Sequence, residues 1–236
     1  MSKDKKILII LDANAIIHRA FHALPDFRTQ RGELVNAVYG FVSILLKVLR
    51  EFEPEYVAAA FDVAGPTFRD VEYEEYKAKR VKAPDELYAQ IPKVKEVLGA
   101  FDIPVYEKQG FEADDVIGTV AKLIQKKQAH PKAETVIVSG DLDTLQLVDE
   151  HTKVYTMRKG LADTVLYDIE AVKKRFTGLT PEQMIDYKGL RGDPSDNIPG
   201  VTGVGEKTAI QLLSNFGSID NLYKEIEEGT EKSKVK

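Results

Sequence analysis

Three short apolar runs of the chain each end at an aspartate, and this arrangement can gather carboxylates around a cation. The runs, each with its acid, are residues 7–11 with Asp12, residues 57–61 with Asp62, and residues 136–140 with Asp141. Aliphatic runs of this length, separated by helical stretches, are typical of parallel strands buried on both faces, so the three acids are expected at one edge of one sheet. Like charges held this close repel strongly unless a cation lies among them. The pattern predicts a divalent metal site at the carboxyl ends of the strands, where open α/β sheets bind ligands.

Six further acids fall in places that can approach the same edge. They are Asp143, close after Asp141; Glu112, Asp114 and Asp115 in the first turn of a predicted helix; and Asp193 and Asp196 in a turn at a helix end. A helix N-terminus favours negative charge, and we expect Glu112 and Asp115 to face the same way, with Asp114 turned partly aside. Acids commonly cap helices and end strands, which would be the favoured explanation for Asp143 or Asp193 alone. Nine carboxylates from five segments instead favour two metal ions, which can activate a water and stabilise the leaving oxygen of a phosphodiester.

The composition limits both the metal and the class of protein. The 236 residues include no cysteine and only four histidines, so any metal must be held mainly by oxygen, which points to Mg²⁺ or Mn²⁺. No apolar run is long enough for a bilayer and no signal peptide precedes the first strand, so we expect no membrane partner and a cytoplasmic location. The net charge of −5 leaves a nucleic-acid partner open, because removing the nine carboxylates from 38 acids leaves 29 against 33 lysines and arginines.

The elements that must position these acids follow from the hydrophobic periodicity. Helices are predicted at residues 15–22, 36–52, 88–101, 116–127, 169–176, 181–190 and 207–216, a short strand at 104–106, and an antiparallel edge pair at 153–156 and 164–167. Residues 67–90 are polar and lack a clean apolar stripe, so we expect a helical excursion that stands away from the sheet. The pattern predicts an α/β fold with a mostly parallel central sheet flanked by helices, over residues 1–170, and a helical subdomain over 171–236.

A glycine-rich turn precedes the last predicted helix. Gly203 and Gly205 allow positive φ and close backbone approach, and N–H groups at the following helix start can hold a phosphate. This favours a helix-hairpin-helix turn that grips the DNA backbone. A P-loop fits less well, because Glu206 stands where the lysine should follow the last glycine and no aliphatic strand precedes the turn. A plain glycine-terminated helix corner is the other alternative, and the nearby acids Asp193 and Asp196 weaken it.

Rings and cations interleave in the polar excursion. Phe68, Arg69, Tyr73, Tyr76 and Lys77 could meet phosphates and unpaired bases. A solvated helix with paired charges is an equally open interpretation of this segment taken alone.

Taken together, these motifs resemble the 5′-nuclease (flap endonuclease) family, and within it the 5′→3′ exonuclease domains of bacterial DNA polymerase I. The resemblance extends from about residue 7 to residue 222. It is carried by residues 36–41, 67–69, 76–77, 112–115 and 192–200 and by the turn at 203–208.

The resemblance implies a PIN-like nuclease core with a helical arch at residues 67–90 and a C-terminal helix-hairpin-helix subdomain. It implies that the nine acids bind Mg²⁺ or Mn²⁺ at two sites, that Lys77 and Arg80 of the arch lie near the scissile phosphate, and that Arg19 contacts a phosphate. The DNA-binding residues that it implies are Phe68, Arg69, Tyr73, Tyr76, Gly200, Gly203, Gly205, Lys207 and Thr208. The turn of such proteins can also take a K⁺ ion on its carbonyl groups.

The implied activity is cleavage of DNA or RNA-primer phosphodiesters at 5′ flaps and nicks, with 5′-phosphate products, in replication and repair. We expect a monomer. We also expect the chain to be part of a longer one that carries a polymerase, because such nuclease domains continue beyond Lys236. Leu142 departs from the family, whose polymerase-linked domains often carry arginine there.

Two other classes of function are left open. One is a flap-DNA binding module with weak or lost cutting. The other is an aspartyl-nucleophile phosphatase, which is disfavoured because Asp12-Ala13-Asn14 lacks the second acid of an Asp-x-Asp motif.

Overall fold

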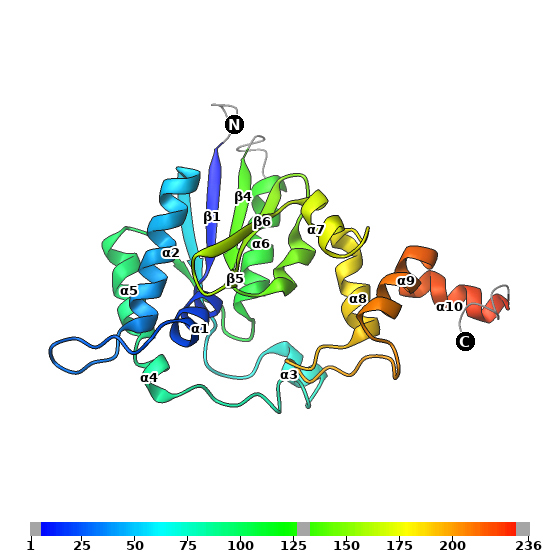
Figure 1. Ribbon diagram of the computed structural model, residues 1–236, viewed down its shortest axis with the longest axis horizontal. Helices are drawn as coiled ribbons and strands as arrows, with labels where there is room; N and C mark the ends of the chain where they lie inside the picture. The colour runs from blue at the N-terminus through cyan, green and yellow to red at the C-terminus, as the bar shows by residue number, and fades with distance from the viewer. Residues whose placement is uncertain (1–5, 127–132, 230–236) are drawn as a thin grey trace.

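A twisted six-stranded sheet forms the centre of the computed structural model, which describes residues 6–126 and 133–229 (Figure 1). The strands are β1 (Ile7–Asp12), β2 (Tyr56–Ala60), β3 (Val105–Tyr106), β4 (Glu134–Ser139), β5 (Thr152–Lys159) and β6 (Asp163–Tyr167). They lie in the order β3-β2-β1-β4-β5-β6, and only β6 runs antiparallel to its neighbour. The predicted mostly parallel sheet and the antiparallel edge pair are confirmed.

The central strand β1 has a neighbour from a different part of the chain on each side. Ile10 lies level with Ala58 of β2 and with Ile137 of β4. The chain therefore goes from β1 to β2 and β3 on one side of β1, and then crosses back to form β4 on the other side. Such a reversal opens a crevice at the carboxyl end of the central strand, where α/β proteins bind ligands.

Helices cover both faces of the sheet. They are α1 (Ala13–Ala23), α2 (Asn36–Phe52), α3 (Phe68–Glu72), α4 (Asp85–Tyr88), α5 (Ile91–Ala100), α6 (Ala113–Lys126), α7 (Ile169–Arg175), α8 (Met184–Arg191), α9 (Glu206–Phe216) and α10 (Ile219–Glu228), with 3₁₀ turns at Leu142–Leu147 and Pro181–Gln183. Alternate residues of β1 point to opposite faces. Ile9 packs in one hydrophobic cluster with α1, α2 and α5, and Ile10 packs in another with α6 and the C-terminal helices.

The polar excursion differs from the prediction in two ways. It is not one helix: α3 spans five residues, turns follow, and an extended stretch leads to α4. The backbone leaves the helical region because Lys77 has a φ of 54° and Pro84 precedes α4. The last part of the excursion also does not stand away from the sheet, since Leu87 is buried in the hydrophobic cluster that includes Ile9 and Ala59. We keep the name arch for residues 67–90.

Smaller differences concern helix ends. The predicted helix 88–101 is split, because α4 ends at Tyr88 and α5 begins at Ile91, with Pro92 in its first turn. Lys127, the predicted end of α6, lies outside the described residues. The sequence analysis did not predict α10.

The C-terminal helices extend the hydrophobic cluster that lies on the sheet face covered by α6. Residues from α7, α8, α9 and α10 share one hydrophobic cluster with Leu8 and Ile10 of β1. The loop 192–205 joins α8 to α9 and passes beside the arch, where the Lys77 backbone N–H donates to the Asp196 carbonyl over 2.9 Å (Figure 1). Among the described residues, no helix combines the length and the apolar character that a bilayer crossing requires.

Candidate metal centre

The first acidic group lies at the carboxyl ends of β1, β2 and β4, where the sequence places Asp12, Asp62 and Asp141. Asp12 is 4% exposed, and its carboxylate accepts hydrogen bonds from Ala15 N at 3.1 Å and Ser139 Oγ at 2.6 Å. Burial is the main cause that raises the pKa of Asp12 to about 6, and the charges of Asp62 and Asp141 act in the same direction. The three strand-end carboxylates therefore share one negative environment, as predicted.

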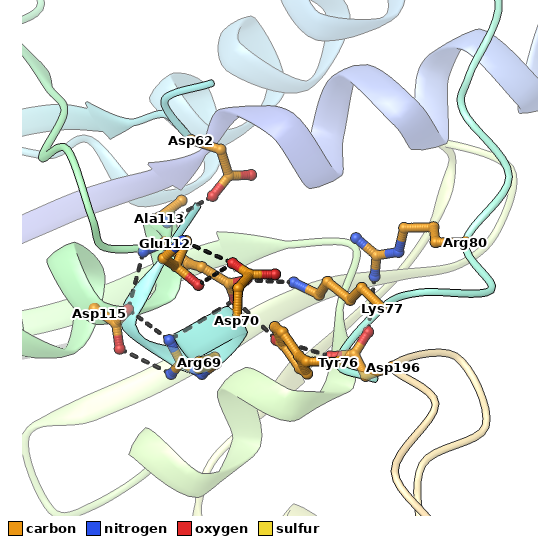
Figure 2. A network of polar contacts seen from close by, with 11 residues as sticks. Asp62, Arg69, Asp70, Tyr76, Lys77, Arg80, Glu112, Ala113, Asp115 and Asp196 are labelled. Carbon is orange, nitrogen blue, oxygen red and sulfur yellow. Dashed lines mark hydrogen bonds and ion pairs between the residues drawn. The ribbon is translucent and has the colours of Figure 1, made fainter. Parts of the chain in front are cut away.

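The N-terminus of α6 adds a fourth acid to this group, and it is Asp114. Burial raises the pKa of Asp114 to about 8, with further increases from the charges of Asp12, Asp141 and Asp62. The Ala113 backbone N–H donates to Asp62 over 2.7 Å, which holds this helix start against the end of β2 (Figure 2). Glu112 and Asp115 face the same way, as predicted, since Arg69 Nη1 lies 3.9 Å from Glu112 Oε2 and 2.7 Å from Asp115 Oδ2. Asp114 turns aside from them and faces the strand ends.

Asp115 is the acid that turns away from the strand ends. Its carboxylate receives two hydrogen bonds from the Arg69 guanidinium, at 2.7 and 2.9 Å, and a third from the Glu112 backbone N–H at 2.9 Å. Burial acts to raise the pKa of Asp115, but the hydrogen bonds from Arg69 and from the Glu112 N–H, together with the charges of Arg69 and Lys77, outweigh it and the pKa is lowered. The carboxylate folds back to cap its own helix and so faces away from the strand ends.

A second acidic group consists of Asp143, Asp193 and Asp196. Each offers a carboxylate oxygen within 4.8 Å of the others. Asp193 is 7% exposed and accepts from the Ser195 backbone N–H at 3.0 Å and hydroxyl at 2.5 Å. Asp143 N donates to Asp141 Oδ1 over 2.9 Å, so the two groups adjoin each other.

The electrostatics of the second group depend on Lys188 of α8. Burial acts to raise the pKa of Asp193, but hydrogen bonds from Lys188 and Ser195 outweigh it and lower the pKa to about 2. Burial and the charge of Asp141 raise the pKa of Asp143 despite its contact with Lys188. A set of carboxylate oxygens at this spacing matches the ligands that hard divalent cations prefer.

Cationic and phenolic side chains of the arch point at the acids (Figure 2). Lys77 Nζ lies 2.7 Å from Glu112 Oε1, and Arg80 lies 2.9 Å from Asp196 Oδ1. The Tyr76 hydroxyl lies 3.1 Å from both Glu112 Oε2 and Asp196 Oδ2. The arch therefore closes over the acidic groups and adjoins Asp196 of the second one.

The aromatic residues of the arch occupy different environments. Tyr76 is 8% exposed, and in this arrangement its hydroxyl contacts carboxylates while its ring faces protein. Phe68 is exposed, with the Arg69 guanidinium 4.5 Å from its ring centre and Phe111 beside it. Tyr73 donates to the Asn197 carbonyl over 3.4 Å. Roles for Phe68, Arg69, Tyr73 and Tyr76 in DNA binding stay predictions.

Arg19 lies on α1 with its side chain near Gly140, at the border of the first acidic group. Its guanidinium donates to the carbonyl oxygens of Met157 and Arg158, at the end of β5. The Arg19 Nε is buried and has no hydrogen-bond partner among the described residues. The predicted phosphate contact of Arg19 stays a prediction.

The glycine turn of loop 192–205 is exposed and leads into the eleven residues of α9. Gly203 adopts the positive φ that glycine allows, at +83°, whereas Gly205 has a φ of −93° and does not use that freedom. Gly200 is the tightest point, since a Cβ there would lie 2.3 Å from the Arg191 carbonyl carbon. Lys207 and Thr208 are exposed in the first turn of α9.

The sequence analysis missed three residues that organise the acids. Ser139 donates to Asp12 and accepts from the Asp141 backbone N–H, and Lys188 and Ser195 hold Asp193. Ser139 could have been identified from the sequence, because it is a small polar residue at the end of the buried apolar run 136–139. Lys188 carried none, because its contact with Asp143 spans two distant parts of the chain.

Two protein families match consecutive parts of the chain. The family described as "5′-3′ exonuclease, N-terminal resolvase-like domain" matches residues 7–177, and the family described as "5′-3′ exonuclease, C-terminal SAM fold" matches residues 179–236. The chain belongs to the 5′-3′ exonuclease family. The resemblance seen in the sequence is thereby confirmed.

Relatives within the 5′-3′ exonuclease family include two proteins named DNA polymerase I. The protein from Chloroflexus aurantiacus is 47% identical over 225 residues, covering 94% of this chain and 23% of the relative. The protein from Bacillus subtilis is also 47% identical, covering 95% of this chain and 25% of the relative. The chain spans about a quarter of the length of these relatives.

Solved structures share the fold of the exonuclease chain. A structure described as divalent metal ions (zinc) bound to T5 5′-exonuclease has a TM-score of 0.76 at 21% identity, covering 93% of this chain and 79% of that one. The catalytic core of Rad2 in complex with DNA substrate has a TM-score of 0.60 at 22% identity, covering 98% and 68%. These likenesses confirm the predicted fold class, a PIN-like core with a helical C-terminal part.

Proposed function

We propose that the chain is a divalent-metal-dependent 5′ nuclease that hydrolyses phosphodiesters of DNA and RNA primers at 5′ flaps and nicks. The observation that carries the proposal is the convergence of two acidic groups beneath an arch whose cations point at them. Membership of the 5′-3′ exonuclease family supports the reaction class. The products would carry 5′-phosphates.

The acidic groups fit divalent cations by the chemistry of their donors. Asp12, Asp62, Asp114 and Asp141 would hold one ion and Asp143, Asp193 and Asp196 a second, with Glu112 and Asp115 completing the set of nine. The raised pKa values of Asp12 and Asp114 indicate that protein cations alone do not neutralise the first group. Bound Mg²⁺ or Mn²⁺ would supply Lewis-acid activation of water and stabilisation of the leaving 3′ oxygen.

Lys77 and Arg80 provide the positive charge that the protein itself contributes. Their head groups face Glu112 and Asp196, where the phosphate of a bound strand would meet the metals. We assign them the neutralisation of charge that develops on that phosphate. Arg19, beside Gly140, is proposed to contact a neighbouring phosphate once its guanidinium leaves the β5 carbonyls.

The glycine turn is proposed to hold duplex DNA away from the acids. The exposed backbone at Gly203 and Gly205 and the half-buried backbone at Gly200, with Lys207 and Thr208 at the start of α9, offer N–H groups and a positive helix end to phosphates. A K⁺ ion on the carbonyl groups of the turn belongs to the same proposal. We also propose a covalently linked polymerase, which the relatives named DNA polymerase I suggest. A monomeric state and a cytoplasmic location are further parts of the proposal.

A 5′-flap duplex labelled at its 5′ end tests the proposal. We expect the labelled strand to be shortened in the presence of Mg²⁺ or Mn²⁺ and to stay intact in the presence of EDTA. Asp12→Asn should reduce cleavage at least about a hundredfold while retaining a shifted band on a gel, because it removes a metal ligand and no duplex contact. Asp102→Asn, at an exposed aspartate after α5, is the matched control and should cleave like the wild type.

The alternatives give other outcomes in the same assay. A shifted band with intact label under every metal condition would favour a flap-DNA binding module and contradict the nuclease. Release of phosphate from a simple monoester, with flap DNA untouched, would favour a phosphatase.

A further inference from the structure

The ammonium of Lys188 lies between two of the three carboxylates of the second acidic group. Lys188 Nζ is 2.6 Å from Asp143 Oδ1 and 2.7 Å from Asp193 Oδ2. Oxygens of these two acids and of Asp196 all lie within 4.8 Å of one another. The lysine thus contacts the same acids that a divalent ion in this group would use.

The packing of α8 sets the position of this ammonium. Lys188 lies on α8, where Tyr187 and Leu190 are buried in the hydrophobic cluster shared with the sheet. Asp193 follows the end of α8, while Asp143 belongs to the 3₁₀ turn after β4. One amine therefore ties the C-terminal helices to the edge of the sheet where the acids gather.

Asp193 and Asp196 also have protein donors other than Lys188. Asp193 receives two hydrogen bonds from Ser195, and Asp196 receives one from Tyr76 and an ion pair from Arg80. Lys188 bridges two members of the group, and its side chain is 34% exposed, so its amine can leave toward solvent.

We propose that Lys188 is a built-in counter-ion of the second acidic group. It holds Asp143 and Asp193 together when no divalent ion is bound, and it competes with that ion for their oxygens. This inference rests on the proposed function, because it assigns the affinity of the second metal position to one residue. The second ion binds more weakly than its three carboxylates alone would dictate, because binding must displace an ammonium.

Titration of the protein with Mn²⁺ in the absence of DNA tests this role, with free Mn²⁺ measured by electron paramagnetic resonance. We expect the wild type to show a tighter and a weaker site. Lys188→Met should tighten the weaker site about tenfold, a change of about 1.4 kcal/mol that loss of one competing charge contact can supply. Lys188→Arg should keep the weaker site weak, and Lys174→Met, at an exposed lysine of α7, should bind like the wild type.

Two results would overturn the role of Lys188. One is a Lys188→Met protein, folded by circular dichroism, whose weaker site is unchanged or weaker still. The other is a Lys188→Arg protein that gains affinity as Lys188→Met does. If Lys188→Met does not fold, Lys188→Gln takes its place with the same expected tightening. A wild type that binds no Mn²⁺ would contradict the proposed function itself, so the two failures are distinguishable.

Discussion

Tyr76 joins carboxylates from two separate parts of the chain through one hydroxyl group. Its oxygen lies 3.1 Å from Glu112 at the start of α6 and 3.1 Å from Asp196 in the loop after α8. Burial, followed by the charges of Glu112 and Asp196, raises the pKa of Tyr76, so the hydroxyl keeps its proton and remains a donor. A single O–H can donate to one acceptor at a time, so the two acids share it.

We expect Tyr76→Phe to lower the free energy of unfolding of the metal-free protein by about 1 kcal/mol, because a buried donor to two acids is lost while the ring is kept. Urea unfolding followed by circular dichroism measures the change. Tyr73→Phe is the matched control, since its longer contacts of 3.3 and 3.4 Å should contribute little. Equal losses in both variants would contradict the positioning role of Tyr76.

The pH dependence of stability depends on Asp12 and Asp114, whose pKa values are raised to about 6 and about 8. Each folded carboxyl retains a proton that the unfolded chain releases near pH 4, so the folded state becomes less favoured as the pH rises. We expect the melting temperature of the metal-free protein to fall between about pH 5 and pH 8. Saturating Mg²⁺ should remove most of this fall, because bound cations compensate the ionised acids.

Calorimetry at a series of pH values, with EDTA or with Mg²⁺, measures this dependence. Asp114→Asn should flatten the upper part of the metal-free profile, since its amide does not ionise. A metal-free melting temperature that rises from pH 6 to pH 8 would contradict the crowding of these acids.

At the scale of elements, loop 192–205 depends on a close approach of two backbone segments. Gly192, at a φ of +79°, faces Gly200, and a Cβ on Gly200 would lie 2.3 Å from the Arg191 carbonyl carbon and 2.4 Å from Gly192 N. No L side chain fits there without moving the backbone. This packing holds Asp193 and Asp196 of the same loop beside Asp143.

We expect Gly200→Ala to destabilise the protein by about 1–3 kcal/mol, as overpacked sites do, and to weaken Mn²⁺ binding through displacement of the loop acids. Gly205→Ala is the control, because Gly205 has a φ of −93° and a Cβ added there would meet open space. Urea unfolding and Mn²⁺ titration measure both variants. A Gly200→Ala protein as stable as Gly205→Ala would show that the loop adapts without loss.

At the scale of the whole molecule, one hydrophobic cluster connects the sheet with the C-terminal helices. It extends from Leu8 and Ile10 of β1, through Ile117 of α6, to Leu213 of α9 and Leu222 of α10. The boundary predicted at residues 170 and 171 falls within α7, whose Val172 belongs to this cluster. The second acidic group also draws Asp143 from one side of that boundary and Asp193 from the other.

We expect the protein to unfold in a single transition, with circular dichroism and tyrosine fluorescence giving the same midpoint in urea. Leu213→Ala should move both midpoints together and cost about 2–5 kcal/mol, because Leu213 is fully buried in the shared cluster. Exposed Leu123→Ala serves as the control and should cost far less. Two separate transitions would show that the parts before and after α7 fold independently.

The sequence by itself determined the strands, the acids at their ends and the family. These depend on local patterns: the apolar runs before Asp12, Asp62 and Asp141 predict parallel strands, and strand direction alone then collects the three carboxylates. The helix 36–52 was likewise predicted to the residue, since its apolar face repeats over several turns.

Only the tertiary structure decided how the acids are oriented and neutralised. Asp114 faces the strand ends, where the Ala113 N–H binds Asp62, while Asp115 is engaged by Arg69, 46 residues away in the sequence. The arch lies on the acids because Tyr76 contacts Asp196, 120 residues away. Contacts over such distances leave no periodicity in a single sequence, because they depend on which surfaces the folded chain brings together.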